Sequence, residues 1–281
     1  MDERIRPERF YEAYLLDMDG TVYLGDELLP GARRFVTELR RRGVPVRFLS
    51  NNPTKTPAQY ADKLTALGLP TPADQIANTV VTMTRWLLAH HPAAVVFPIA
   101  EAPLIESFAA AGIAMSEDPT EIDVVVASYD RTFDYRKLQI AFDAIRGGAI
   151  LVATNPDRYC PLPGGRGEPD CAAIVAAIEA STQVSCQHYA GKPNPQMVAQ
   201  ALVGLDVDPR QCLMVGDRLG TDIELALRAG LDSALLLTGD STLADVAATP
   251  AGHRPTYVVD RIDHLLPQDC WTNLGWTDPN P

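Results

Sequence analysis

Several features that often decide a protein's function are missing from this 281-residue chain. None of its five cysteines forms a Cys-x-x-Cys pair and its histidines show no zinc-type spacing, so neither a zinc knuckle nor a redox dithiol is expected. No apolar run approaches the ~18 residues that span a bilayer, and the charged start MDERIRPERF does not resemble a signal peptide. We therefore expect a cytoplasmic protein with reduced thiols and no membrane segment.

Positive charge is also scarce, because 24 lysines and arginines stand against 36 aspartates and glutamates, for a formal net charge of −12. Nucleic acids and anionic membranes are polyanions, so neither is expected as a partner. A local site can still be positive, which keeps a small phosphorylated ligand open. The length and the hydrophobic fraction of 46% indicate one large globular domain or two smaller ones.

Short apolar runs predict strands that are buried on both faces, because most of them do not alternate with polar residues. The expected strands are Ala13–Leu16, Val44–Leu49, Val95–Phe97, Val124–Ala127, Ile150–Ala153, Leu213–Val215 and Ala234–Leu237. Helical spacing appears between them at residues 30–43, 56–68, 171–181 and 221–230, the last with Thr221 and Glu224 placed as a capping box. This alternation predicts an α/β fold with a mostly parallel sheet.

The middle of the chain carries its own strands and helices. We therefore expect a second domain, residues 80–187, inserted into an outer domain of residues 1–79 and 188–281. The loop CPLPGGRGEPD (160–170) precedes a helix but lacks the Lys-Ser/Thr of a P-loop. The C-terminal segment QDCWTNLGWTDPNP (268–281) has little pattern and is expected to pack on the surface or fray.

Small polar and acidic residues follow three strands of the outer domain. Along the chain they are Asp17 and Asp19, then Ser50, Asn51 and Asn52, and then Gly216 and Asp217. In an open parallel sheet, ligands bind at the carboxyl ends of the strands. Two aspartates one residue apart repel each other, so they are either solvated in a turn or completed by something positive. The segment AGKPNP adds Lys192 near a helix start.

The segments DMDGT, FLSNN, GKPNP and GDRLGTD, in this order, resemble the four motifs of the haloacid dehalogenase-like (HAD) phosphatases. The large insert between the second and third resembles the cap domain of the NagD-like branch, which includes p-nitrophenylphosphatase and phosphoglycolate phosphatase-like enzymes. YLGDELLPGA and NNPTKTPAQYADKL also fit that branch. The resemblance covers about residues 12–240. It implies a Rossmann-like core with a mostly parallel sheet, an inserted α/β cap of type C2 and hydrolysis of a small phosphomonoester.

The resemblance also implies a role for each motif residue. Asp17 would attack phosphorus and carry an aspartyl-phosphate, while Asp19 would act as acid and then as base. Mg²⁺ is the implied cofactor, held by the Asp17 carboxylate, the Asp19 main-chain carbonyl and the Asp217 carboxylate. Asp222 would support the metal site through water or orient Lys192.

The phosphate itself would be held by Lys192, Ser50 and Asn51. Lys192 balances the charge of the nucleophile and the phosphate, and the Ser50 hydroxyl with nearby backbone N–H groups holds phosphoryl oxygens.

Each motif taken alone has a plainer interpretation. DMDGT could be a strand followed by an Asp-Gly turn, Lys192 could be a surface lysine, and an acid such as Asp222 is favoured in the first turn of any helix. A calcium-binding EF-hand is excluded, because Val22 and Leu28 occupy the positions that require Gly and Glu. The ordered set of four, rather than any one motif, favours the phosphatase.

The resemblance puts the loop after TNPD near the entrance to the site. Asn155, Asp157 and Arg158 are therefore candidate substrate contacts, with a plain loop turn as an equal alternative. The family's Pro-Gly-x-Gly before the next helix is here Pro169-Asp170-Cys171, and Gly220 stands where relatives often carry an acidic residue. These departures leave the substrate open among sugar phosphates, phosphoglycolate and nucleotides.

Two further functions stay open beside the phosphatase. A phosphoryl transferase or mutase would use the same aspartyl-phosphate with an alcohol acceptor. A non-catalytic protein would bind a phosphorylated metabolite without turnover. A dehalogenase is disfavoured, because Asp19 and the Mg²⁺ ligands belong to the phosphatase side of the superfamily. Cap-mediated dimers occur in related proteins, so a homodimer is also allowed.

Overall fold

The computed structural model describes residues 6–162 and 164–277 and divides the chain into two compact units. Unit 1 comprises Met1–Leu49, Leu64–Thr71 and Ala201–Pro281, and unit 2 comprises Ser50–Lys63 and Pro72–Gln200. The expected assignment of residues 80–187 to a cap domain stays a prediction.

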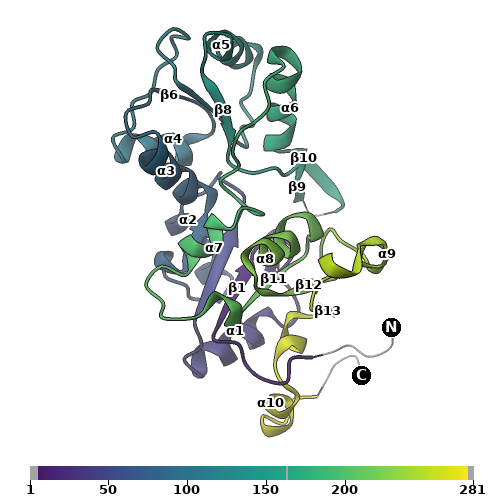
Figure 1. Ribbon diagram of the computed structural model, residues 1–281. Coiled ribbons are helices and arrows are strands. Elements are labelled where there is room, and N and C mark those ends of the chain that lie inside the picture. The colour runs from purple at the N-terminus through teal and green to yellow at the C-terminus, as the bar shows by residue number, and fades with distance from the viewer. Residues whose placement is uncertain (1–5, 163, 278–281) are drawn as a thin grey trace. The chain divides into compact units, whose positions relative to one another are not determined.

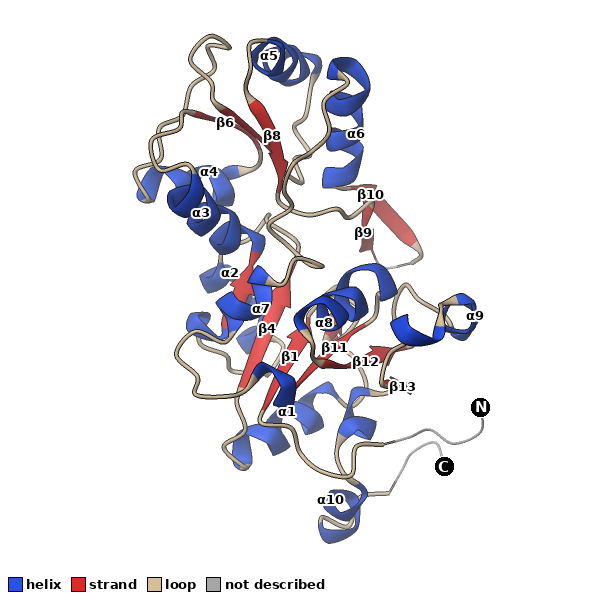
Figure 2. Cartoon of the chain, in the orientation of Figure 1, coloured by secondary structure: helices blue, strands red, loops and turns tan. Residues whose placement is uncertain are grey.

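A parallel sheet forms the centre of unit 1 (Figures 1 and 2). Within this unit the strands run in the order β13 (Tyr257–Val259), β12 (Asp232–Leu236), β11 (Cys212–Gly216), β1 (Ala13–Asp17) and β4 (Val46–Ser50). Leu16 of β1 lies opposite Val215 of β11 and Phe48 of β4. Every residue of β1 and β11 is buried, which confirms the α/β fold with strands covered on both faces.

Shorter elements complete unit 1. They are the antiparallel pair β2 (Tyr23–Leu24) and β3 (Glu27–Leu28), α1 (Ala32–Arg41), the 3₁₀ turn η2 (Pro209–Gln211), the π-helical turn η3 (Leu219–Ile223), α8 (Glu224–Ala229), α9 (Leu243–Ala248), the 3₁₀ turns η4 (Ala251–His253) and η5 (Ile262–Leu265), and α10 (Gln268–Asn273). Helix α1 buries Phe35, Val36 and Leu39, and Gly43 follows with a φ of 71°. The helical pattern of residues 30–43 is therefore confirmed.

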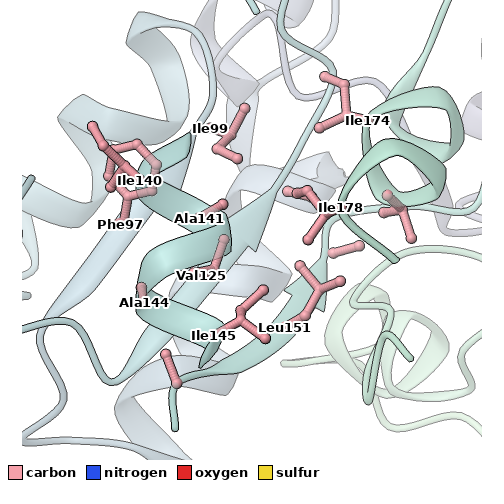
Figure 3. Packing of buried hydrophobic residues seen from close by; sticks show 14 of the residues in the cluster. Phe97, Ile99, Val125, Ile140, Ala141, Ala144, Ile145, Leu151, Ile174 and Ile178 are labelled. Atoms are coloured by element: carbon pink, nitrogen blue, oxygen red, sulfur yellow. The ribbon is translucent and has the colours of Figure 1, made fainter. Parts of the chain in front are cut away.

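The core of unit 2 lies on both faces of a second parallel sheet, in the order β6 (Val96–Ile99), β7 (Val124–Ala127) and β8 (Ile150–Ala153). Val125 and Leu151 belong to the cluster that contains α5 (Tyr135–Arg146) and α6 (Cys171–Thr182), shown in Figure 3. Their neighbours Val124 and Val152 belong to the cluster that contains α3 (Thr79–His90) and α4 (Ala102–Ala110). Alternate residues of these strands thus pack against helices on opposite faces of the sheet, so apolar residues occupy successive positions along each strand.

The remaining elements of unit 2 are η1 (Ala73–Gln75), β5 (Ile76–Asn78), β9 (Tyr159–Leu162) and β10 (Arg166–Pro169). Helices α2 (Pro57–Ala66) and α7 (Gln196–Ala201) each contain a point at which the chain passes from one unit to the other. The expected strands are all present, with ends within two residues of the predicted ones. The strands that the sequence did not predict have two to four residues, too few for a pattern to appear.

Two local expectations are wrong. Thr221 lies inside η3 and no side chain caps α8, so Thr221 and Glu224 form no capping box, whereas Gly230 does end α8 with a φ of 72°. Residues 160–170 contain the hairpin β9–β10 rather than a plain loop, although Pro163 lies outside the described residues. The C-terminal segment is expected to pack on the surface or fray, and its residues 268–273 form α10, which packs with Trp271 only 2% exposed. Residues 278–281 lie outside the described part of the chain.

None of the helices in residues 6–162 and 164–277 has the length and apolar composition that a bilayer crossing requires. All five cysteines fall within these ranges and are free thiols.

Candidate active site

Three carboxylates converge in unit 1 at the carboxyl ends of β1 and β11. Asp17 is the last residue of β1, Asp217 directly follows β11, and Asp222 lies in η3. One oxygen from each lies within 4.8 Å of the other two, and all three residues are buried. Like charges this close repel one another, and a divalent cation prefers such oxygen ligands. The donor set therefore fits a divalent metal ion, and we call it the acidic cluster.

Three glycines make room for the acidic cluster. A Cβ at Gly20 would lie 2.7 Å from Oδ2 of Asp217, and a Cβ at Gly239 only 1.9 Å from the same oxygen. A Cβ at Gly216 would lie 2.2 Å from Cγ of Asp222. Because a Cβ at any of these places would force the neighbouring carboxylate to shift, the positions of Asp217 and Asp222 depend on these three glycines.

The loop that follows β12 holds Asp217 in place. The backbone N–H of Asp240 donates to Oδ2 of Asp217 (2.9 Å), and the N–H of Ser241 donates to its carbonyl (3.1 Å). The Thr238 hydroxyl donates to the carbonyl of Gly20 (2.6 Å). Sequence reasoning missed this loop. The signal that could have found it is TGDS directly after a predicted buried strand of the same sheet.

Asp19 is not a member of the acidic cluster. It is only half-buried, and the Tyr23 hydroxyl donates to its Oδ2 (3.0 Å). The chain turns between them, with the N–H of Gly20 donating to the carbonyl of Tyr23 (2.8 Å). The two aspartates of DMDGT therefore have different surroundings. Asp17 is buried beside two other carboxylates, whereas Asp19 is partly exposed and hydrogen-bonded to the Tyr23 hydroxyl.

Unit 2 contains a second polar cluster, centred on Asn51. The N–H of Lys192 donates to Oδ1 of Asn51 (2.7 Å), and Nδ2 of Asn51 donates to the carbonyl of Lys192 (3.0 Å). The same Nδ2 donates to Oδ2 of Asp157 (2.9 Å). We call Asn51, Lys192, Asp157 and Asn155 the amide network. Its central side chain pairs with both backbone groups of the predicted catalytic lysine.

The backbone of Asn51 is held as firmly as its side chain. Its carbonyl accepts from the Thr79 hydroxyl (2.8 Å) and from Nδ2 of Asn155 (3.0 Å). Beside it, a Cβ at Gly191 would lie 2.5 Å from Oδ1 of Asn51. Gly191 therefore permits the close approach of the GKPNP segment to Asn51, and Lys192 itself is 3% exposed.

Ser50 lies at the end of β4 and is 4% exposed. Its hydroxyl accepts from the N–H of Asn52 (3.1 Å) and lies 3.5 Å from the Tyr60 hydroxyl, which in turn donates to the carbonyl of Asn52 (3.2 Å). These bonds fix the backbone of the SNN turn.

The candidate substrate contacts have divergent positions. Asn155 is fully buried and Asp157 is 8% exposed, both within the amide network, whereas Arg158 is exposed. Asp170, the departure from the family pattern, is the N-cap of α6, and its carboxylate accepts from the N–H of Cys171 (2.5 Å). With a φ of −110°, that position does not require glycine.

Comparison with known proteins identifies the family. The profile of the haloacid dehalogenase-like hydrolases matches residues 14–114, and a second HAD hydrolase-like profile matches residues 189–265. An acid sugar phosphatase of Staphylococcus aureus is 35% identical over 237 residues, which cover 84% of this chain and 90% of that protein. The chain belongs to the haloacid dehalogenase-like hydrolases, as the four motifs predicted.

Solved structures agree. A 4-nitrophenylphosphatase from Thermotoga maritima superimposes with a TM-score of 0.85 at 34% identity, covering 92% of this chain and 98% of that one. NagD from Escherichia coli gives a TM-score of 0.81 at 26% identity, with 91% and 98% covered. The predicted resemblance to the NagD-like branch is confirmed, and with it the α/β fold of the family.

Proposed function

We propose that this protein is a Mg²⁺-dependent phosphatase that hydrolyses a small phosphomonoester through an aspartyl-phosphate on Asp17. The observation that carries the proposal is the acidic cluster, in which Asp17 lies within 4.8 Å of Asp217 and Asp222. Membership of a hydrolase family, and relatives named as acid sugar phosphatase and 4-nitrophenylphosphatase, support it.

The residues that would hold Mg²⁺ are Asp17 and Asp217, with the Asp19 main-chain carbonyl as a further ligand and Asp222 in support. Buried carboxylates cradled by glycines at 20, 216 and 239 suit a small hard cation. When bound, the ion supplies positive charge that keeps Asp17 ionised and draws charge from the phosphoryl oxygens.

Two residues of DMDGT would share the bond-making and proton transfers. A carboxylate oxygen of Asp17 attacks phosphorus, the bond from phosphorus to the alcohol oxygen breaks, and Asp19 gives its proton to the departing alkoxide. Water then attacks the aspartyl-phosphate and loses a proton to Asp19. Inorganic phosphate leaves and both carboxyl groups return to their starting state. The half-buried position of Asp19, bonded to Tyr23, supports its role as the group that exchanges protons.

The amide network would place the positive charge. Asn51 binds both backbone groups of Lys192, which supports a fixed main chain for the residue whose ammonium would balance the phosphate. The Ser50 hydroxyl and the backbone of the SNN turn would hold phosphoryl oxygens. Asn155, Asp157 and Arg158 stay proposed substrate contacts, and the exposure of Arg158 supports that role best.

Several finer points belong to the same proposal. The substrate is a small phosphorylated metabolite, and the name of the S. aureus relative supports a sugar phosphate first. Residues 80–187 would form the cap that selects it. We further propose a cytoplasmic setting, which the five free thiols support, and leave a homodimer as one form of the active protein.

The direct test is phosphate release from p-nitrophenyl phosphate and a panel of sugar, nucleotide and glycolate phosphates, with Mg²⁺ and with EDTA. Asp17→Asn should abolish release, by roughly three orders of magnitude or more, as expected for a lost nucleophile. Asp26→Asn, an exposed aspartate in the turn between β2 and β3, is the matched control and should keep full activity. Release that Asp17→Asn leaves unchanged would remove Asp17 as the nucleophile. Metal-dependent binding without release would favour a binding protein, and release only with an added alcohol acceptor would favour a transferase.

A further inference from the structure

A separate pocket lies in unit 1 beside helix α1, with a volume of about 550 Å³. Its wall includes Arg33, Arg34 and Thr37 of α1, together with Arg261 and Trp276 from the C-terminal part of the chain. None of the three carboxylates of the acidic cluster lines it. Its size falls within the range of pockets that hold small metabolites.

Three arginines line this pocket, namely Arg33, Arg34 and Arg261. Each of the two nearby carboxylates, Asp263 and Glu38, accepts hydrogen bonds from two arginines. Asp263 is fully buried and accepts from both Arg34 (3.2 Å) and Arg261 (2.9 and 3.0 Å). Asp263 is therefore a carboxylate that two of the lining guanidinium groups share.

The lining carboxylate Glu38 is likewise engaged elsewhere. It accepts two bonds from Arg41 (2.8 Å each) and one from Arg42 (2.6 Å). These arginines hold the pKa of Glu38 at about 2, well below its ordinary value. Glu38 is therefore ionised, and the guanidinium groups of Arg41 and Arg42 already compensate its charge.

Arg33 adds a charge that no carboxylate of the described residues balances. Its guanidinium donates to the carbonyls of Gly68 (2.9 Å) and Leu67 (3.0 Å) and is otherwise exposed. These two bonds use two of the five N–H groups and hold the guanidinium beside residues 67 and 68. On a chain with a net charge of −12, Arg33 is an exposed positive charge on a residue that lines this pocket.

An aromatic wall completes the pocket. The Arg34 guanidinium lies 4.8 Å from the ring centre of Trp276 and 5.1 Å from that of Trp271. Such stacking holds a guanidinium in one orientation and leaves its edge for hydrogen bonding. Arginine forks of this kind match the oxygen spacing of a phosphate group.

We propose that this pocket binds a small phosphorylated molecule at a site distinct from the acidic cluster. The arginines receive the phosphate dianion, and the indole of Trp276 borders the rest of the ligand. The site goes beyond the proposed hydrolysis and does not depend on it.

The test is isothermal titration of the full chain in EDTA, so that the proposed hydrolysis does not consume the probe. The probes are inorganic phosphate, ribose 5-phosphate, adenosine 5′-monophosphate and adenosine. Two variants at Thr37, an exposed residue of the lining, form a matched pair. Thr37→Glu places a negative charge at the pocket, and Thr37→Gln has the same size without the charge.

We expect at least one phosphorylated probe to bind, with Thr37→Glu weakening it tenfold or more and Thr37→Gln changing it less than twofold. Arg146→Ala, an exposed arginine at the end of α5 in unit 2, should leave affinity unchanged. The phosphate, sugar and nucleotide arms distinguish the source of the phosphate group. Binding that Thr37→Glu and Thr37→Gln affect equally, binding of adenosine alone, or no binding of any probe at millimolar concentration would overturn the proposal. Failure of the phosphatase assay would leave this result untouched.

Discussion

In unit 1, three buried carboxylates share one site, whereas in unit 2 a single amide side chain joins two backbone groups and one carboxylate. The first arrangement concentrates charge of one sign, which is costly in a protein interior unless a cation compensates it. The second pairs each donor of Asn51 with an acceptor and its acceptor with a donor. The difference teaches that the acidic cluster is arranged for a partner from outside the chain, while the amide network is arranged to keep its own geometry.

After Asp17→Asn, the largest effect is expected when Lys192 loses only its side-chain charge. Lys192→Met keeps the length of the side chain and both backbone bonds to Asn51, but it removes the ammonium charge. We expect kcat for phosphate release to fall on the order of 100-fold or more, as when a charge-stabilising donor is lost. Thermal unfolding should change little, because the amide network remains. A variant that keeps full kcat would show that the lysine serves only the fold.

Glycine at 239 offers a way to disturb the acidic cluster without touching a carboxylate. Gly239→Ala places a Cβ 1.9 Å from Oδ2 of Asp217, so that carboxylate must move. We expect the Mg²⁺ concentration for half-maximal activity to rise about tenfold or more, as for other changes behind a metal ligand.

The control is Gly220→Ala, because a Cβ at Gly220 meets no atom within 4 Å and its φ is not positive. Its metal requirement should match that of the unchanged chain. Equal Mg²⁺ curves for both variants would contradict the account of how Asp217 is positioned.

Adding a negative charge to the amide network tests whether its donors and acceptors satisfy one another without an outside partner. Asn51→Asp loses the donor to the Lys192 carbonyl and puts a second carboxylate beside Asp157. We expect roughly 3 kcal/mol less stability in urea unfolding, from unsatisfied buried groups. Adding Asp157→Asn restores one donor between the two positions, so the double variant should recover part of the loss. No recovery would mean that the two residues are not coupled.

The smallest expected effects are losses of stability at acidic pH, which should occur in a different pH range in each unit. In unit 2, burial lowers the pKa of His188 from 6.5 to about 4, with the nearby His90 adding to the shift, while Trp86 stacks on its ring. In unit 1, the pKa of Glu38 falls from 4.5 to about 2 through its bonds to Arg41 and Arg42. The fold therefore favours neutral His188 and ionised Glu38.

Both contributions are complete at neutral pH and are lost as the pH falls, but in different windows. The His188 contribution declines between about pH 6.5 and 4, and the Glu38 contribution between about pH 4.5 and 2. Hydrogen exchange followed separately in β7 and β11 should show unit 2 loosening first. His188→Phe should remove the earlier step, and Glu38→Gln the later one. Loss of both steps in either variant would contradict this assignment.

Much of this could be predicted from the sequence because buried parallel strands and their polar ends leave strong local signals. Asp17 and Asp217 stand directly after apolar runs, and their convergence follows from the parallel sheet. The order of the four motifs then identified the family.

Other features could not be predicted because they depend on contacts between distant segments. The bonds from Asp240 and Thr238, and the Asn51 side chain on the backbone of Lys192, join residues that no local pattern connects. Asp170 looked like an added charge at the site entrance, whereas the fold uses it as a helix cap. A role for Trp276 could not be predicted, because its position in the pocket beside α1 depends on residues that are far away in the sequence.

The measurement that tests the central claim most directly is the stereochemical course at phosphorus. It is followed with a phosphorothioate monoester that carries two oxygen isotopes and is hydrolysed in water of the third isotope, so that the released thiophosphate is chiral. Attack by Asp17 and then by water gives two inversions, so the account predicts net retention of configuration. Net inversion would mean a single direct attack by water. It would contradict the aspartyl-phosphate, whatever the roles of the acidic cluster and the amide network.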